Sequence, residues 1–173
     1  MAYTFLASED YEIGKSLVET DKISTASSLM KKAKERNVKL ILPIDHIVTN
    51  KIDPSAEYKV TSIQETPIEW MGVDIGPETI IRFKQQIAAA KTILWNGPLG
   101  VFEVEPFAQG TMAIAQAVAE SHATTIVGGG DSIAAVTKAG VEGKISHIST
   151  GGGASLEFLG GLKLPGVEAL SEK

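Results

Sequence analysis

The feature that most constrains this chain is a repeated unit in which a short apolar run leads directly into glycines and then into a helical pattern. Thr124–Gly140 is one such unit: an apolar run, Gly128 to Gly130, Asp131, and a helical pattern ended by Gly140. A second triplet, Gly151–Gly153, follows another apolar run. Each glycine costs roughly 0.5–1 kcal/mol relative to alanine in regular structure. Glycines concentrated between strand and helix therefore indicate that another group comes close to that backbone.

Apolar runs rich in branched residues predict the strands of a sheet. Four runs have this character, at Val38–Leu42, Thr92–Trp95, Thr124–Val127 and Ile145–Ser149. They do not alternate with polar residues, as is typical of strands buried on both faces in a parallel sheet. Helical patterns lie between them, so the sequence predicts a three-layer α/β/α, Rossmann-like fold with a mainly parallel sheet.

The helical segments carry recognisable boundaries. Apolar residues from Ala26 to Ala33 follow helical spacing, and Pro77 and Pro106 each stand where a first helical turn is expected. Ser132–Ala139 is expected to form a short helix with Asp131 or Ser132 as its N-cap. Tyr58–Ile63 has a mixed pattern and is interpreted as a loop or an edge strand.

Composition indicates an ordinary globular domain. The chain has 173 residues, of which 43% are hydrophobic and 21% charged, and we expect a single domain over residues 1–173. The formal net charge of -5, without a basic cluster, argues against a nucleic-acid partner. No apolar stretch reaches the length of a membrane span. Cysteine is absent, which excludes disulfides, and we expect a cytoplasmic location.

Ligands of open parallel sheets bind beyond the carboxyl ends of the strands. Right-handed crossovers would bring four loops to one edge, beginning at Pro43, Asn96, Gly128 and Gly151. Exposed N–H groups and the positive ends of helices favour an anion such as phosphate there. Alternatively, the glycines only permit tight turns and close packing. Two known phosphate motifs do not match. Glu9 stands where a Walker A loop needs its first glycine, and Ile133 and Leu156 stand where a dinucleotide fingerprint needs glycine or alanine.

Several side chains near these glycines have two readings. Asp131 could reach a magnesium ion bound to phosphate, or could simply cap its helix. Glu103 could accept hydrogen bonds from a ribose, or could lie exposed in a loop. Cations are scarce: between Asn96 and Glu157 the chain has only Lys138 and Lys144. Because phosphoryl transfer needs cations or metal at the moving group, this segment would hold a nucleotide with part of the catalytic charge missing.

Long motifs in the chain resemble those of phosphoglycerate kinases. WNGPLGVFE begins at Trp95, IVGGGDS at Ile126 and STGGGASLEFL at Ser149, and LPGVEAL follows at Leu164. MAYTFL, LPIDHIV and WMGVDIGPET fit the same family, so the likeness covers the whole chain in order. The resemblance implies reversible phosphoryl transfer from 1,3-bisphosphoglycerate to ADP, giving 3-phosphoglycerate and ATP with Mg²⁺ in glycolysis. It implies a two-lobed, monomeric kinase whose lobes close about a hinge.

The resemblance also implies roles for individual residues. Leu17, Gly72 and Val73 would lie near the adenine, and Asp131 would approach Mg²⁺. Gly129 and Gly130, with Gly151, Gly152 and Gly153, would serve catalysis at the phosphates and the transferring group. The full set implied to bind ATP or ADP is Leu17, Gly72, Val73, Asn96, Pro98, Gly100, Val101, Glu103, Gly129, Gly130, Asp131 and Ser132.

The family comparison further implies that this chain is most of the C-terminal, nucleotide-binding lobe, incomplete at its N-terminal side. The lobe that binds phosphoglycerate would be absent, and the isolated chain is expected to be inactive. An unpaired sheet edge would then favour self-association of the chain. The alternative is a free-standing nucleotide-binding or interaction module without catalysis.

Overall fold

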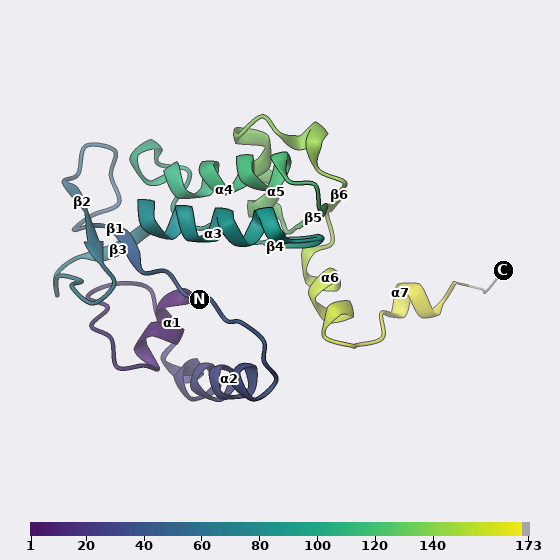
Figure 1. Ribbon diagram of the computed structural model, residues 1–173, viewed down its shortest axis with the longest axis horizontal. Coiled ribbons are helices and arrows are strands. Elements are labelled where there is room, and N and C mark those ends of the chain that lie inside the picture. The colour runs from purple at the N-terminus through teal and green to yellow at the C-terminus, as the bar shows by residue number, and fades with distance from the viewer. Residues whose placement is uncertain (171–173) are drawn as a thin grey trace. The chain divides into compact units, whose positions relative to one another are not determined.

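The computed structural model describes residues 1–170, whose order of helices and strands can be followed in Figure 1. The α-helices are α1 Ala2–Ala7, α2 Ile23–Glu35, α3 Pro77–Ala89, α4 Gln109–Glu120, α5 Gly130–Lys138, α6 Gly152–Leu159 and α7 Pro165–Glu168. The strands are β1 Asp45–Thr49, β2 Tyr58–Ser62, β3 Met71–Ile75, β4 Thr92–Asn96, β5 Thr124–Gly128 and β6 His147–Ser149. The 3-10 turns are η1 Thr20–Lys22, η2 Glu105–Phe107 and η3 Glu142–Lys144. Within residues 1–170, every helix is too short or too polar to cross a membrane.

Backbone contacts divide the chain into two compact units. Unit 1 consists of Met1–Phe83 together with Leu99–Thr111. Unit 2 consists of Lys84–Pro98 together with the chain from Met112 onward. Each unit has its own three-stranded sheet.

The sheet of unit 2 is parallel, with the strand order β4-β5-β6. Val127 in its central strand is completely buried and Trp95 in β4 is 7% exposed, as expected for strands packed within a core. Helices flank this sheet in Figure 1. The predicted α/β class with a parallel sheet is confirmed, and so are the three strands predicted between Thr92 and Ser149.

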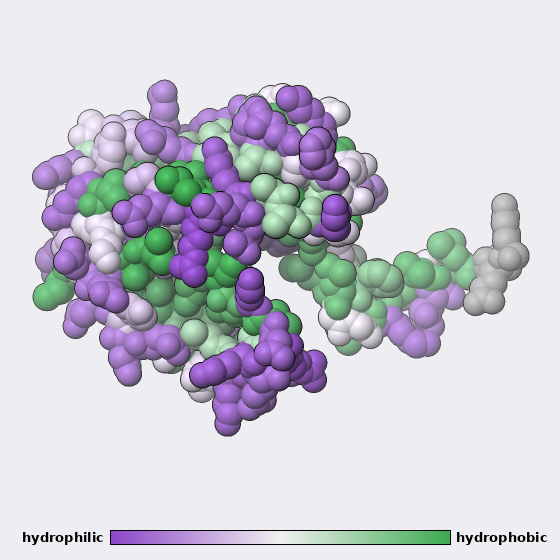
Figure 2. Space-filling model, in the orientation of Figure 1, coloured by the Kyte–Doolittle hydropathy of each residue, from purple (hydrophilic) through white to green (hydrophobic). Residues whose placement is uncertain are grey.

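Helix α5 forms because its small and apolar residues fall on one face. Ser132, Ala135 and Val136 on that face are buried, and the chain leaves the helix at Gly140, which has a φ of 67°. This positive φ is favourable for glycine and explains why the helix ends there. Helices α6 and α7, by contrast, expose apolar side chains to solvent, as the green surface of this segment shows in Figure 2.

The sheet of unit 1 is antiparallel and has the order β2-β1-β3. Its central strand β1 is buried at every residue. Ile47, Val73 and Phe107 form a core cluster, and burying a side chain such as that of Phe107 contributes about 1.5–3 kcal/mol. Strand β2 lies at the edge of this sheet, which confirms the edge-strand interpretation of Tyr58–Ile63.

The prediction of a strand at Val38–Leu42 is wrong. This segment has no ladder partner among residues 1–170, and the side chains of Val38 and Leu40 are 61% and 40% exposed. The strand of this region lies a few residues later, at β1, and pairs antiparallel with both neighbours. An apolar run indicates strand propensity, but a strand forms only where a neighbouring strand pairs with its backbone N–H and C=O groups. The loop from Pro43 therefore does not follow a strand of the parallel sheet.

Helix capping also differs from the sequence prediction in two places. Helix α5 has Gly129 as its N-cap, without a side-chain cap from Asp131 or Ser132. Helix α3 begins at Pro77 as predicted, but the Asp45 carboxylate accepts the N–H groups of Glu78 and Thr79 at 2.9 Å and 2.7 Å. This cap comes from β1, far away in sequence, and could not be found from local spacing.

Candidate functional site

The three strands of unit 2 end together. Asn96 pairs with Gly128 across β4 and β5, and Gly128 pairs with Ser149 across β5 and β6. Because the strands are parallel, their carboxyl ends lie at one edge of the sheet. The loops that begin at Asn96, Gly128 and Gly151 therefore meet there, as predicted.

The loop after β5 presents a free helix start. Gly129 has a φ of 93° and a ψ of 144°, a conformation that side-chain-bearing residues rarely adopt. The N-terminal N–H groups of α5 follow immediately, and no side chain of the described chain caps them. Helix starts of this kind carry partial positive charge and bind anions. Gly130 adds no steric barrier, since a Cβ built there would meet nothing within 4 Å.

The two glycine triplets pack against each other through their backbones. A Cβ at Gly152 would lie 2.6 Å from the Cα of Gly129 and 2.8 Å from its nitrogen, so only glycine fits at position 152. The N–H of Gly129 donates to the carbonyl oxygen of Ser149 at 3.4 Å. The start of α6 is therefore held beside the start of α5, and this helix also has no side-chain cap within residues 1–170.

Side-chain hydrogen bonds fix the loop after β4 to the glycine loop. The Asn96 amide donates to the carbonyl oxygen of Gly128 at 3.0 Å, and the N–H of Gly97 donates to the Ser132 hydroxyl at 2.6 Å. Ser132 is 1% exposed. The Ser132 hydroxyl thus holds the loop after β4 at Gly97, the residue before Pro98. These contacts bring Asn96, Gly129, Gly130 and Ser132 together within unit 2.

Asp131 is the candidate metal ligand. It is exposed in the first turn of α5, and its carboxylate does not cap this helix. Residues 1–170 contain no group of three or more His, Asp or Glu side chains arranged to hold a metal ion. A single exposed carboxylate beside an anion site suits Mg²⁺, which commonly takes one or two carboxylates and completes its shell with phosphate oxygens and water. The residues therefore fit a metal that arrives with a nucleotide.

Unit 1 contains the remaining predicted residues. The N–H of Gly72 donates to the Ser16 hydroxyl at 2.9 Å, which brings the neighbouring Leu17 towards β3. Leu17 itself is 84% exposed. The N–H of Val101 donates to the carbonyl oxygen of Val73 at 2.7 Å. Val73 and Val101 are therefore joined by a backbone hydrogen bond, and Gly72 is joined to Ser16, the residue before Leu17. Gly100 and Glu103 belong to the same unit.

Glu103 lies exposed in the segment that follows Val101. Its side chain is available to a ligand, but no hydrogen bond within the described chain fixes its orientation. Both readings of Glu103, ribose ligand and exposed loop residue, thus stay predictions. The roles of the other predicted site residues likewise stay predictions.

Sequence reasoning missed the polar residues that organise these loops. The Thr111 hydroxyl accepts the N–H groups of Leu99 and Gly100 at 3.1 Å and 3.0 Å. The buried Asp74 carboxylate accepts the N–H groups of Ile75 and Gly110 at 2.9 Å and 2.6 Å. One signal was present in the sequence, since aspartate is depleted in strands and Asp74 interrupts an apolar run.

Burial shifts three titratable groups of unit 1. Burial raises the pKa of Asp74 to about 7, although the N–H groups of Gly110 and Ile75 favour the carboxylate. Burial lowers the pKa of His46 to about 4, while the neighbouring Asp45 acts in the opposite direction. His46 lies between the Tyr3 hydroxyl at 2.7 Å and the Thr66 hydroxyl at 3.2 Å. Burial likewise raises the pKa of Tyr3.

Comparison with known proteins identifies the family. The family model described as phosphoglycerate kinase matches residues 1–162. The chain belongs to the phosphoglycerate kinase family. Its sequence is 58% identical over its whole length to a phosphoglycerate kinase from Acidobacterium capsulatum, of which it covers 43%. It is 54% identical over its whole length to the phosphoglycerate kinase of Pelotomaculum thermopropionicum, of which it covers 44%.

Solved phosphoglycerate kinases have the same fold in this region. The structure from Coxiella burnetii matches 93% of this chain with a TM-score of 0.90 and 47% identity, and the match covers 42% of that protein. The structure from Pyrococcus horikoshii matches 98% of the chain with a TM-score of 0.81 and 32% identity, again over 42% of that protein. The family resemblance found in the motifs is therefore confirmed. The chain spans less than half of the length of these phosphoglycerate kinases.

Proposed function

We propose that this chain is the nucleotide-binding half of a phosphoglycerate kinase and binds ADP or ATP together with Mg²⁺. The observation that supports it best is the pair of uncapped helix starts, at α5 and α6, held side by side by the contact between Gly129 and Gly152. Backbone N–H groups at such helix starts bind phosphate groups, and the exposed carboxylate of Asp131 can bind the accompanying metal.

In this proposal the residues of the chain bind and orient, and the metal supplies charge neutralisation at the phosphates when it is bound. Gly129, Gly130 and the triplet Gly151–Gly153 hold the phosphates, because their backbone can be approached without steric hindrance. Asn96 keeps the β4 loop attached to Gly128. Leu17, Gly72 and Val73 provide the surface for the base, and Glu103 the hydrogen-bond acceptor for the ribose.

The complete reaction would be the reversible transfer of a phosphoryl group from 1,3-bisphosphoglycerate to ADP in glycolysis, in the cytoplasm. Phosphoglycerate would bind to the other lobe of a full-length, monomeric enzyme, with closure of the two lobes bringing the substrates together. The isolated chain would therefore bind nucleotide weakly and turn over no substrate, because it lacks cationic side chains in its glycine loops.

Calorimetric titration with ADP in the presence and absence of Mg²⁺ tests this proposal, with amide chemical shifts as the local readout. We expect shifts at Gly129, Gly130 and Asp131 on addition of Mg-ADP. The variant Asp131→Asn should lose the part of the affinity that depends on Mg²⁺ and should keep the binding of metal-free ADP. The absence of both heat and amide shifts in the wild-type chain would refute nucleotide binding.

Self-association of the isolated chain is a further part of the proposal. Strand β2 is an edge strand whose Tyr58 and Val60 are 46% and 52% exposed. The segment Val38–Leu42 adds the exposed apolar side chains of Val38 and Leu40. Unpaired sheet edges such as that of β2 pair readily with another chain. Sedimentation velocity over a range of concentrations should reveal dimers, and a monomer at every concentration would contradict this expectation.

A further inference from the structure

The segment Leu99–Thr111 belongs to unit 1, although the residues on both sides of it belong to unit 2. This segment contains Gly100, Val101 and Glu103, which are proposed to bind the nucleotide. Its helical elements are the 3-10 turn η2, Glu105–Phe107, and the first residues of α4 from Gln109, so its shape depends on contacts with β3.

Asp74 on β3 touches both ends of this segment. Its carboxylate accepts the N–H of Gly110 at 2.6 Å, near the end of the segment. Near the beginning, a Cβ built on Gly100 would lie 2.3 Å from the Asp74 Oδ1, and a Cβ on Gly110 would lie at the same distance. Two glycines from opposite ends of one loop thus leave room for the same carboxyl group. Asp74 is 3% exposed.

The neighbouring backbone reinforces this contact. The N–H of Val101 donates to the carbonyl oxygen of Val73, the residue before Asp74, at 2.7 Å. Thr111 accepts the N–H groups of Leu99 and Gly100, which closes the segment on itself. A buried carboxylate must find hydrogen-bond donors, and here they are backbone N–H groups of Ile75 and of the loop.

We propose that Asp74 is a positioning residue that fixes both ends of the segment Leu99–Thr111 against β3 and so presents Gly100 and Val101 to the nucleotide. This inference rests on the proposed nucleotide binding. Asp74 does not need to touch the nucleotide, because its effect passes through the loop that it anchors. A substitution here changes the loop of unit 1 and leaves the glycine triplets of unit 2 intact.

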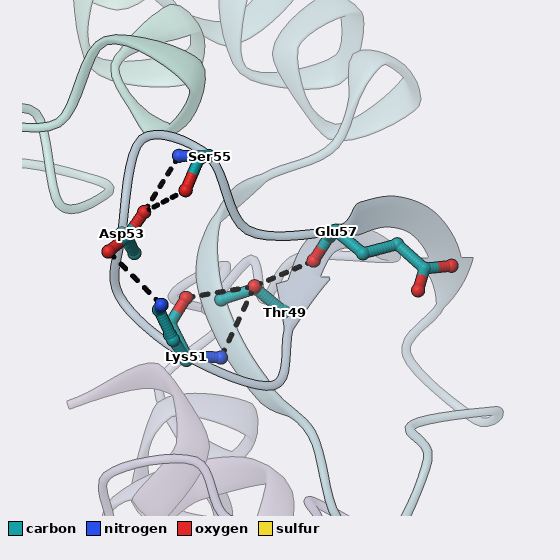
Figure 3. A network of polar contacts seen from close by, with 5 residues as sticks. All are labelled: Thr49, Lys51, Asp53, Ser55 and Glu57. Carbon is teal, nitrogen blue, oxygen red and sulfur yellow. Dashed lines mark hydrogen bonds and ion pairs between the residues drawn. The ribbon is translucent and has the colours of Figure 1, made fainter.

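The test compares Asp74→Ala and Asp74→Asn with the control Asp53→Asn. Figure 3 shows why Asp53 is a suitable control: this acid also accepts a backbone N–H, from Ser55 at 2.9 Å, and pairs with Lys51. It lies in the loop between β1 and β2, and its partners there, Lys51, Ser55 and Ala56, are not proposed ligand residues. All three variants are compared at a temperature at which circular dichroism shows them folded.

For Asp74→Ala we expect the affinity for Mg-ADP to fall about tenfold, the loss typical of one hydrogen bond to a charged group. The Gly100 and Gly110 amides should exchange faster with solvent, and Mg-ADP should no longer shift Val101. The chemical-shift changes that Mg-ADP causes at Gly129 and Gly130 should persist in this variant. Asp74→Asn keeps one acceptor oxygen and should recover part of the affinity, while Asp53→Asn should match the wild type.

Wild-type affinity and wild-type Val101 shifts in folded Asp74→Ala would overturn the proposal. Unchanged exchange at Gly100 and Gly110 in that variant would overturn it as well. If the wild-type chain does not bind Mg-ADP, nucleotide binding fails, and the exchange of these two amides still decides whether Asp74 fixes the loop. If Asp74→Ala does not fold, the exchange and affinity of Asp74→Asn decide the question.

Discussion

Acidification should destabilise unit 1 through His46. This side chain is 1% exposed, and burial lowers its pKa to about 4, whereas a histidine in an unfolded chain has a pKa of about 6.5. Below about pH 6.5, His46 therefore binds a proton in the unfolded chain but stays neutral in the folded chain. The stability contributed by neutral His46 is complete above this pH and is lost as the pH falls towards 4.

The two pKa values fix the size of the effect. Between about pH 7.5 and about pH 5, the difference in proton binding corresponds to a loss of about 2 kcal/mol in the free energy of unfolding. Asp74 acts in the opposite direction over the same range, because its pKa in the folded chain is raised. The pH dependence of the wild-type chain alone would therefore hide the contribution of His46.

Urea denaturation of the wild type and of His46→Asn, each at these two pH values, separates the contributions. Asparagine does not titrate and keeps a polar group near the Tyr3 hydroxyl. The wild-type chain should lose about 2 kcal/mol more on acidification than the variant, and His122→Asn, at an exposed position, should behave like the wild type. Equal losses in wild type and His46→Asn would refute the reasoning, as would an imidazole signal of His46 that titrates above pH 6.

Four further outcomes are expected. Gly152→Ala should lower the free energy of unfolding by about 1–3 kcal/mol and weaken Mg-ADP binding, because its Cβ would overlap Gly129. Gly153→Ala should be neutral or stabilising in urea denaturation, since nothing lies within 4 Å of its Cβ. The free energy of unfolding of the wild type relative to Asp74→Asn should fall by about 2 kcal/mol between about pH 5 and about pH 8, because the raised pKa of Asp74 favours the folded state only while it is protonated. Asp45→Ala should cost about 2 kcal/mol in thermal or urea unfolding, because the N–H groups at the start of α3 lose their acceptor, and an unchanged midpoint would contradict this cap.

The sequence alone determined the parallel sheet of unit 2 and its ligand-binding edge. Strands β4, β5 and β6 are local apolar runs followed by glycine. Each is specified within about ten residues by its strand propensity and by the glycine that ends it. Their parallel arrangement follows from the helices between them. For the same reason the meeting of the Asn96, Gly128 and Gly151 loops follows from the sequence pattern.

Tertiary structure alone decided what depends on partners distant in sequence. Val38–Leu42 has strand propensity but finds no neighbour to pair with, whereas the polar-containing β3 becomes a strand because β1 pairs with it. The hydrogen bonds of Asp45 to α3 and of Asp74 to Gly110 cross more than thirty positions in the chain. A sequence pattern records local preference, while a hydrogen bond between distant residues exists only once folding has brought the donor and the acceptor together.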